Sequence, residues 1–352
     1  MPTFCRHNRF IERCPICSKT LQGSNAAGPG TKRGGAASGG VPRSAGAGSA
    51  SQRRRAAGPG LRVRRETRAL DDGYRSRLVP GLRSTEDAQR LAGEIAFAAA
   101  RLLALAAEPP GLYGRAHELA AQDLEHATWI CFLTAYLCPL QGEDPFAGVR
   151  EAMQRGPATG APRWSAEGGA QGLPNLEGIP LGPRSSHEPA RGPQALIAYL
   201  QWVDRGGASS APVEGTQGAA FTGDPAWSPE RRFERLFERL ALPGLSRFCR
   251  YDLLVTLGRL GLYDVRPDSL ALTSGAIAED PTALAAKRVL GIGDPLLLER
   301  RARELADAIP VPVEALDVAL ANWAAPERAT LGFPTLEGEV AVLDQALAAL
   351  GA

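Results

Sequence analysis

Residues 242–246, Leu-Pro-Gly-Leu-Ser, could grip a phosphate, and Asp268 lies 24 residues beyond the glycine of that turn. The Pro-Gly pair permits a tight turn, and backbone N–H groups at the start of a following helix can point at an anion. Arg247 and Arg250 could reinforce this contact. Such a turn binds DNA without reading its sequence, because it touches only the backbone. The turn residues concerned are Leu242, Pro243, Gly244, Leu245 and Ser246.

Simpler interpretations of these residues stay open at this point. A Pro-Gly turn between two helices is common, and Asp268 could be a helix cap or a surface acid. Asp264 is the alternative carboxylate nearby. Lys287, the only lysine after residue 65, suits a phosphate contact or a surface charge.

A second group of chemically active residues stands at the start of the chain: Cys5, His7, Cys14 and Cys17. Two close pairs of soft ligands can fill a tetrahedral zinc site, and four protein ligands leave no open position. We therefore predict a structural Zn²⁺ in a small zinc knuckle. The alternatives are a redox Cys-x-x-Cys pair and a tail with incidental cysteines. Cys131, Cys138 and Cys249 fall in apolar helical context and are predicted to lie in the core.

The charge of the chain is unevenly distributed. Residues 1–65 carry 13 Lys and Arg against one acid, so 27 of the 40 basic and 37 of the 38 acidic residues remain for residues 66–352. A basic arm on an acidic body suits a polyanionic partner such as double-stranded DNA. A solvated tail is the alternative interpretation.

Targeting and nucleotide-binding signals are weak. The polar start, residues 1–13, lacks the apolar region of a secretory signal, and no apolar run approaches the roughly 20 residues of a membrane span. We expect a soluble, cytoplasmic protein without membrane partners. Gly291-Ile292-Gly293 lacks the following lysine and preceding strand of a nucleotide-binding loop.

Three parts are predicted along the chain: the zinc knuckle (1–20), a flexible basic linker (21–60) and a helical domain (61–352). The linker is rich in Gly, Ala and Ser and cannot bury enough apolar surface to fold. Within the domain we predict a hairpin at 230–262, an irregular insertion at 155–192 and a loop at 206–227. Helices are predicted at 85–107, 113–136, 194–203, 229–240, 250–260, 281–290, 314–323 and 337–350, with one more after the cap at Asp294.

At the hairpin the chain resembles the helix–hairpin–helix DNA glycosylase superfamily, in which a similar Leu-Pro-Gly turn is followed at this range by a catalytic aspartate. The Pro267-Asp268 pair matches the 3-methyladenine glycosylase branch. The resemblance implies an all-α glycosylase-like domain with Asp268 as catalytic carboxylate. Two positions depart from the pattern. Ser246 replaces the second glycine of the hairpin, and Phe248 occupies the slot of the lysine nucleophile, so no Schiff-base lyase activity is expected.

A closer resemblance, to the α-glutamyl/putrescinyl thymine pyrophosphorylase family, extends along nearly the whole chain. It rests on residues 4–10 and 14–17, 127–129 and 136–137, 144–146, 286–289, 291–295, 316–317 and 322–323. The family lies within the glycosylase superfamily and is associated with hypermodified bases in phage DNA. Some relatives are anti-phage glycosylases of modified bases.

The resemblance implies a monofunctional DNA glycosylase that hydrolyses the N-glycosidic bond of a modified base in phage DNA, in antiviral defence. One alternative is a base-hypermodifying enzyme that displaces pyrophosphate from an activated hydroxymethyl-pyrimidine, and another is a non-catalytic DNA-binding adaptor. A flipped base favours aromatic stacking and a few polar contacts. The predicted base pocket consists of Trp129, Tyr136, Asp144, Asn322 and Trp323, for which core packing or helix capping is the competing interpretation.

Overall fold

The computed structural model describes residues 69–157, 160–165, 167–206, 216–272 and 280–352. Its elements follow in the order α2 (Thr85–Ala107), α3 (Gly111–Leu119), α4 (Leu124–Leu137), α5 (Ala147–Gln154), β1 (Arg163–Ser165), β2 (Gly169–Gln171), the 3-10 turn η2 (Pro189–Arg191), α6 (Gln194–Asp204), α7 (Gln217–Thr222), α8 (Pro229–Arg239), α9 (Arg247–Arg259), α10 (Pro281–Leu290), α11 (Pro295–Ala308), α12 (Ala315–Ala324) and α13 (Val340–Leu350). This part of the chain is mainly helical, as predicted. The zinc knuckle and the linker lie outside the described residues and stay predictions.

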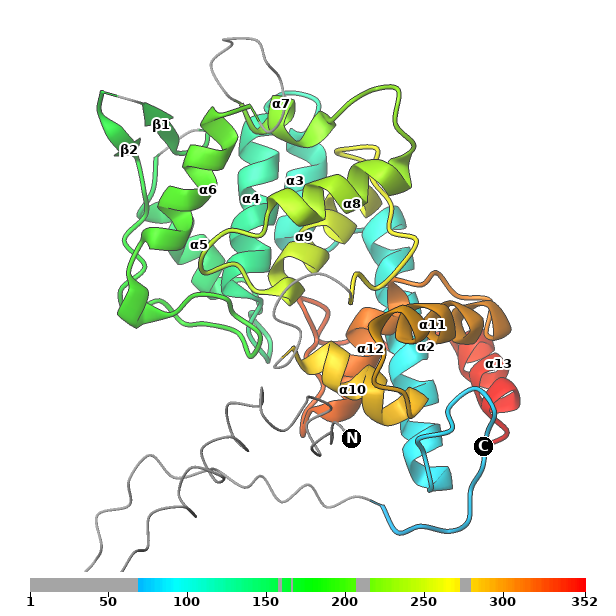
Figure 1. The fold of residues 1–352 in the computed structure, drawn as a ribbon. Helices are drawn as coiled ribbons and strands as arrows, with labels where there is room; N and C mark the ends of the chain where they lie inside the picture. Colours follow the sequence, from blue (N-terminus) through cyan, green and yellow to red (C-terminus); the bar gives the residue numbers. More distant parts are fainter. Residues whose placement is uncertain (1–68, 158–159, 166, 207–215, 273–279) are drawn as a thin grey trace, which may run out of the picture. The chain divides into compact units, whose positions relative to one another are not determined.

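Helix α2 connects two groups of helices. It begins at the predicted residue because the Ser84 hydroxyl accepts a hydrogen bond from the N–H of Asp87 at 3.4 Å. Its small and aliphatic side chains pack against α9, α12 and α13. In Figure 1 it runs from the group α10–α13 into the group α3–α9.

Helix α4 is the centre of the group α3–α9, where it packs against α3, α5, α7 and α9. The prediction of one helix over residues 113–136 was wrong, because the chain breaks at residues 120–123. Asp123 starts α4 there by accepting a hydrogen bond from the N–H of His126 at 2.9 Å. Nearly every residue of α4 is buried, so no amphipathic pattern marks it.

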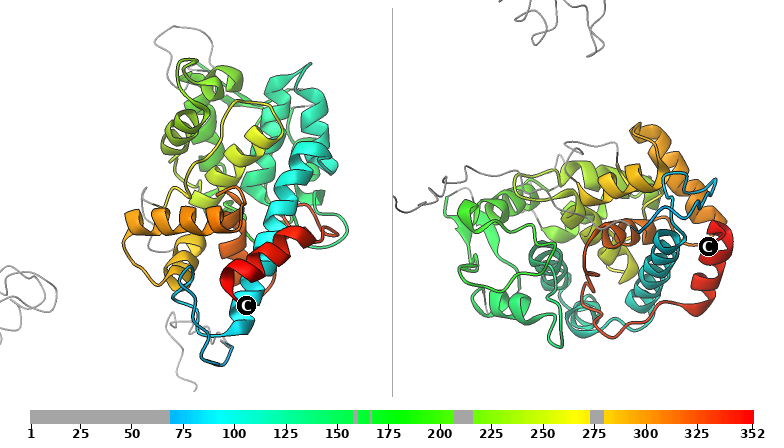
Figure 2. Two further views of the ribbon diagram at one scale, coloured as in Figure 1. Left: turned by 90° about the vertical axis from the view of Figure 1, so that its right-hand side faces the viewer. Right: turned by 90° about the horizontal axis from the view of Figure 1, so that it is seen from below.

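The segment before α2 packs tightly against the group α10–α13. The Gly81 N–H donates to the Val289 carbonyl at 3.0 Å, and a Cβ at Gly81 would lie 1.8 Å from the Arg288 carbonyl oxygen. Only glycine allows this approach. The Tyr74 hydroxyl donates to the Leu350 carbonyl at 2.6 Å, and Figure 2 shows α13 lying along α2.

Two regions predicted to be irregular contain short elements. Within 155–192, β1 and β2 form an antiparallel pair. Within 206–227, the Thr216 hydroxyl caps α7 by accepting the Ala219 N–H at 3.1 Å. The Glu125 carboxylate, at the start of α4, accepts the N–H groups of Gln217 (2.8 Å) and Gly218 (2.7 Å). A contact from a distant segment thus stabilises this short helix.

A buried ion pair joins α2 to α9. Arg101 and Asp252 lie 2.9 Å apart, and their side chains are 1% and 4% exposed. Each charge is stable at this depth only because the other is present. Within the residues that the structure describes, none of the helices has both the length and the apolar character needed to cross a membrane.

Candidate active site

Helices α8 and α9 and the turn between them lie where the sequence predicts a hairpin. Helix α9 starts at Arg247, earlier than predicted, because the Ser246 hydroxyl accepts a hydrogen bond from the N–H of Cys249 at 3.1 Å. Gly244 has a φ of +82°, a conformation that side chains rarely adopt. The Pro-Gly pair therefore makes a tight turn, as expected.

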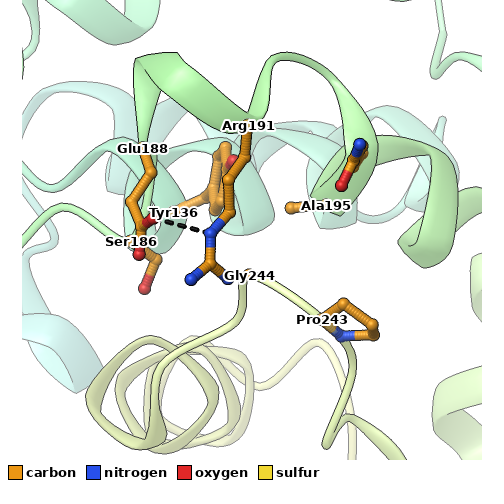
Figure 3. Close-up of a pocket in the computed structure, with 8 residues that line it drawn as sticks. Tyr136, Ser186, Glu188, Arg191, Ala195, Pro243 and Gly244 are labelled. Atoms are coloured by element: carbon orange, nitrogen blue, oxygen red, sulfur yellow. Dashed lines mark ion pairs between the residues drawn. The ribbon is translucent and has the colours of Figure 1, made fainter.

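Another segment of the protein packs against one side of this turn, while Pro243 and Ser246 stay exposed. The Ser186 hydroxyl lies 2.6 Å from the Ser246 hydroxyl and accepts a hydrogen bond from the Ser246 N–H at 3.2 Å. A Cβ at Gly244 would lie 2.7 Å from the Cβ of Ala195, at the start of α6. Figure 3 shows these segments around a cavity of about 20 Å³, which is large enough for a water molecule but not for a phosphate. The start of α9 therefore contacts protein.

The charges beside the covered turn are balanced. Tyr136 and His187 lie behind it, with 3.1 Å between the Tyr136 hydroxyl and His187 Nδ1. Burial raises the pKa of Tyr136 and lowers the pKa of His187, so both are neutral at neutral pH. Arg191 forms an ion pair with Glu188 at 2.6 Å, which Figure 3 marks. These residues together supply no net positive charge for a phosphate.

The two arginines predicted to contact DNA from the hairpin point into the protein. The Arg247 guanidinium lies 2.7 Å from the Asp317 carboxylate and 3.7 Å from that of Asp280. Arg250 donates to the Phe237 carbonyl at 2.9 Å, and burial lowers its pKa. Both arginines are buried and paired with protein groups, so in this structure neither is exposed for the predicted phosphate contact. Lys287 is half-buried on α10.

Asp268 lies in an open groove between α8 and α11. The groove has a volume of about 750 Å³ and shares no lining residue with the cavity at the turn. It is lined by Ser228, Glu230, Arg231, Glu234, Arg235, Asp268, Ser269, Leu296, Glu299, Arg300 and Arg303. Asp268 is exposed, and its carboxylate makes no hydrogen bond or ion pair with any described residue. The alternative carboxylate, Asp264, is paired with Arg232. Asp268 is therefore the one free to act on a ligand.

Side chains from two helices hold the backbone that follows the Asp268 side chain. Arg303 on α11 donates from Nε to the Asp268 carbonyl at 3.0 Å, and the Tyr251 hydroxyl on α9 donates to the Ser269 carbonyl at 2.8 Å. Arg247 donates to the Leu270 carbonyl. Residues 268–270 have no regular secondary structure, but their position is determined by these contacts.

The residues predicted to form a base pocket are dispersed, and two of them belong to the aromatic core. The Phe132 ring is stacked 5.3 Å from Trp129, 5.7 Å from Tyr136 and 3.7 Å from Tyr199. Trp129 and Tyr136 are buried. Core packing accounts for both.

The other three predicted pocket residues serve local structure. Asn322 is buried and accepts hydrogen bonds from Arg184 (2.6 Å) and from the Ala329 N–H (3.0 Å). Trp323 donates from its indole N–H to the Asp87 carbonyl at 3.0 Å. Asp144 is exposed and pairs with Arg150, whose hydrogen bond lowers the pKa of Asp144. These residues do not form the predicted pocket with Trp129 and Tyr136.

Among the described residues, no lysine or cysteine lines the groove. Phe248, in the position of the lysine nucleophile, is buried under the Arg184 guanidinium at 4.8 Å. The three cysteines of the described region are free and buried, as predicted, and burial raises the pKa of Cys138 and Cys249 to about 12. Among the described residues, no cluster of His, Cys, Asp and Glu could hold a metal ion. The four predicted zinc ligands lie outside those residues.

Glu299, Arg300 and Arg303 line the groove but were not predicted as site residues. The sequence does predict their helix, α11, from the Asp294 cap and Pro295, and the spacing of Glu299 and Arg303 places them on one face. Nothing local indicates that this face meets the Asp268 segment.

Comparison with known proteins supports the family resemblance. Residues 185–331 match the family model described as alpha-glutamyl/putrescinyl thymine pyrophosphorylase clade 3, so this part of the chain is similar to the suspected family. The matched residues include the hairpin, Asp268 and α11. No curated protein and no solved structure matches the chain.

Proposed function

Because residues 185–331 match this family, we propose that the protein is an enzyme acting on a modified base in DNA. The reaction that we propose is hydrolysis of the N-glycosidic bond, which leaves an abasic site. One observation carries this proposal: in an open groove of about 750 Å³, the Asp268 carboxylate pairs with none of the described residues while its backbone is held by two helices.

The chemistry follows from that carboxylate. The target base must first leave the stack. As the bond between the base nitrogen and the sugar C1′ breaks, the bonding electrons leave with the base and positive charge develops on the sugar. The Asp268 carboxylate stabilises this charge and orients a water molecule, whose oxygen bonds to C1′. The proton lost by the water neutralises the departing base. No lysine lines the groove, so strand cleavage through a Schiff base is not part of the proposal.

Contact with the DNA backbone is assigned to a different surface from the hairpin tip. Arg231, Arg235, Arg300 and Arg303 line the groove from both sides, beside the four acids Glu230, Glu234, Asp268 and Glu299. Together with the basic residues 1–65, they would contact phosphates without sequence choice. We therefore propose double-stranded phage DNA with modified bases as the partner.

The same arginines favour a second candidate function. Pyrophosphate is a polyanion that a cluster of guanidinium groups can bind. The family description names a pyrophosphorylase. In that reaction an amine would form a bond to the activated methylene carbon of a hydroxymethyl-pyrimidine, and pyrophosphate would leave with the electrons of the broken C–O bond.

One assay separates these functions. The full-length protein is incubated with phage DNA carrying modified bases and with unmodified DNA, and abasic sites are counted. Abasic sites that appear with the wild type and vanish with Asp268→Asn support hydrolysis. Release of pyrophosphate with transfer of an amine favours the second function. Retention of modified DNA in a shift assay without any base loss or transfer indicates a binding adaptor and overturns both.

We also propose that Cys5, His7, Cys14 and Cys17 hold one structural Zn²⁺. Metal analysis of the intact, reduced protein should find about one zinc per chain. The double variant Cys14→Ser with Cys17→Ser should lose it, whereas Cys131→Ser should keep it. A zinc content near zero in the wild type would exclude the site.

A further inference from the structure

The Glu299 carboxylate is buried at the floor of the groove and binds backbone amides. Its side chain belongs to α11, and the residue is 6% exposed. One carboxylate oxygen accepts the Leu270 N–H at 2.8 Å, and the other accepts the Leu272 N–H. No basic side chain among the described residues forms an ion pair with it. The partners of this buried charge are therefore the amides just beyond Asp268.

The backbone between these two amides has a strained conformation. Ala271 has a φ of +52°, a left-handed conformation that costs a residue other than glycine free energy. Successive N–H groups around a left-handed residue form a concave site for an anion. The Glu299 carboxylate occupies this concavity and so stabilises a turn that the alanine by itself disfavours.

Keeping a carboxylate at this position is costly. Burial raises the pKa of Glu299, while the hydrogen bonds from Leu272 and Leu270 oppose that rise. An apolar side chain of similar size would leave the Leu270 and Leu272 N–H groups without this acceptor. The carboxylate therefore fixes the conformation of residues 270–272, and its charge also interacts with Arg247 and Arg303.

We propose that Glu299 is a positioning residue that holds the Asp268 segment in its reactive conformation, an inference that rests on the proposed function. Arg303 lies one helical turn beyond Glu299 on the same face and donates to the Asp268 carbonyl at 3.0 Å. Helix α11 thus holds the segment at two points, before and after the turn at Ala271. The Asp268 carboxylate itself stays free for the substrate.

The test is the isosteric variant Glu299→Gln, with Asp307→Asn as its control. A glutamine oxygen can accept one of the two N–H groups, but its amide nitrogen faces the other as a second donor. Asp307 is an exposed carboxylate on the same helix and does not line the groove. Two readouts are compared: kcat and KM for base release from modified DNA, and hydrogen exchange of the Leu270 and Leu272 amides.

We expect Glu299→Gln to lower kcat by about tenfold or more and to change KM less than about threefold, because the carboxylate moves while the binding surface stays. Amide exchange at residues 270 and 272 should quicken by about tenfold or more. Asp307→Asn should match the wild type in both. If Glu299→Gln does not fold, Ala271→Gly is added to it, since glycine relieves the left-handed strain. The double variant should then fold and still show low kcat and fast exchange.

The outcomes separate the inference from the proposed function. If the wild type releases base, Asp268→Asn does not, and Glu299→Gln keeps kcat within about twofold of the wild type, the positioning role is overturned and the hydrolase stands. If the wild type releases no base, the proposed hydrolase activity is wrong. Hydrogen exchange then decides whether Glu299 holds residues 270–272. Unchanged protection of the Leu270 and Leu272 amides from exchange in Glu299→Gln then overturns the inference. Faster exchange supports the inference that Glu299 holds the Asp268 segment.

Discussion

The hairpin turn at residues 242–246 and the groove around Asp268 belong to the same stretch of chain but differ in what they contact. Ser186 and Ala195 contact one side of the turn, and the cavity left there has a volume of about 20 Å³. The groove is open, with a volume of about 750 Å³, and the Asp268 carboxylate in it has no partner among the described residues. Polar groups at the turn serve the fold, whereas the Asp268 carboxylate in the groove is free for a ligand.

This difference indicates that the hairpin turn and the groove around Asp268 have separate roles. The hairpin supplies rigidity, because α9 carries Arg247 and Tyr251, which hold residues 269–270. The groove contains the Asp268 carboxylate, to which we assign the proposed reaction. We therefore expect changes at the hairpin to alter stability and changes in the groove to alter activity.

The largest effect is expected from Arg247→Met, at the residue that links the two regions. The change leaves the buried carboxylates of Asp317 and Asp280 without their arginine, which should cost about 3–5 kcal/mol of unfolding free energy. Chemical denaturation measures it, with Arg231→Met at the groove rim as the exposed control. A loss below about 1 kcal/mol would show that this link does not hold the site together.

Asp268→Asn should act on the reaction alone. We expect base release to fall by roughly 10²–10³-fold, because a neutral amide stabilises positive charge on the sugar poorly. Stability should be unchanged, since the side chain is exposed and unpaired. Asp264→Asn, which loses only an ion pair with Arg232, is the matched control for the assay of abasic sites. Equal activity of the two variants would remove Asp268 from the mechanism.

Gly244→Ala tests whether the turn is packed against protein. The added Cβ meets both a positive φ and the Cβ of Ala195 at 2.7 Å, which should cost about 2–3 kcal/mol. Gly261→Ala is the control: its φ is +72°, but no atom lies within 4 Å of the added Cβ, so strain alone should cost about 1 kcal/mol. Denaturation midpoints compare the two. Equal losses would contradict a closed turn.

The covered side of the turn should also show a pH dependence. Burial lowers the pKa of His187 below its usual 6.5, so the unfolded chain takes up a proton that the folded protein resists. Stability from this group is fully present above pH 6.5 and is lost as pH falls through the lowered pKa. His187→Asn should make Tm depend less steeply on pH in this window. The change in slope should correspond to the uptake of less than one proton on unfolding. An unchanged slope would mean that His187 is not buried beside Tyr136.

The smallest effect on stability is expected from Arg300→Ala in the groove. Arg300 pairs with Glu304 at 3.0 Å, but its side chain is 74% exposed, so the loss should stay under about 0.5 kcal/mol. Binding to modified DNA should weaken. The slope of the logarithm of affinity against the logarithm of salt concentration should fall by about one, as for the loss of one phosphate contact. Titrations at several salt concentrations measure this, with Arg115→Ala on α3 as the control. If both variants bind equally, the groove does not contact DNA through Arg300.

Elements bounded by strong local signals could be predicted from the sequence. Helices α2 and α10 match their predicted ranges, and α11 starts at its predicted cap. Cap residues such as Ser84 and Asp294 act on amides two or three positions away, so their effect is visible in a short stretch of sequence. The signal for the break before α4, the cap residue Asp123, is also local. It was not predicted because the apolar residues around it suggest one continuous helix.

The sequence by itself determined the helical class, the tight turn at Gly244 and the absence of a lysine at position 248, because each depends on residue type and nearest neighbours. Only the tertiary structure decided that Ser186 closes the turn, that Trp129 and Tyr136 fill the core and that Glu299 meets the amides beyond Asp268. Those contacts join residues far apart in the chain. Their formation depends on how whole helices pack, which no local pattern of residues encodes.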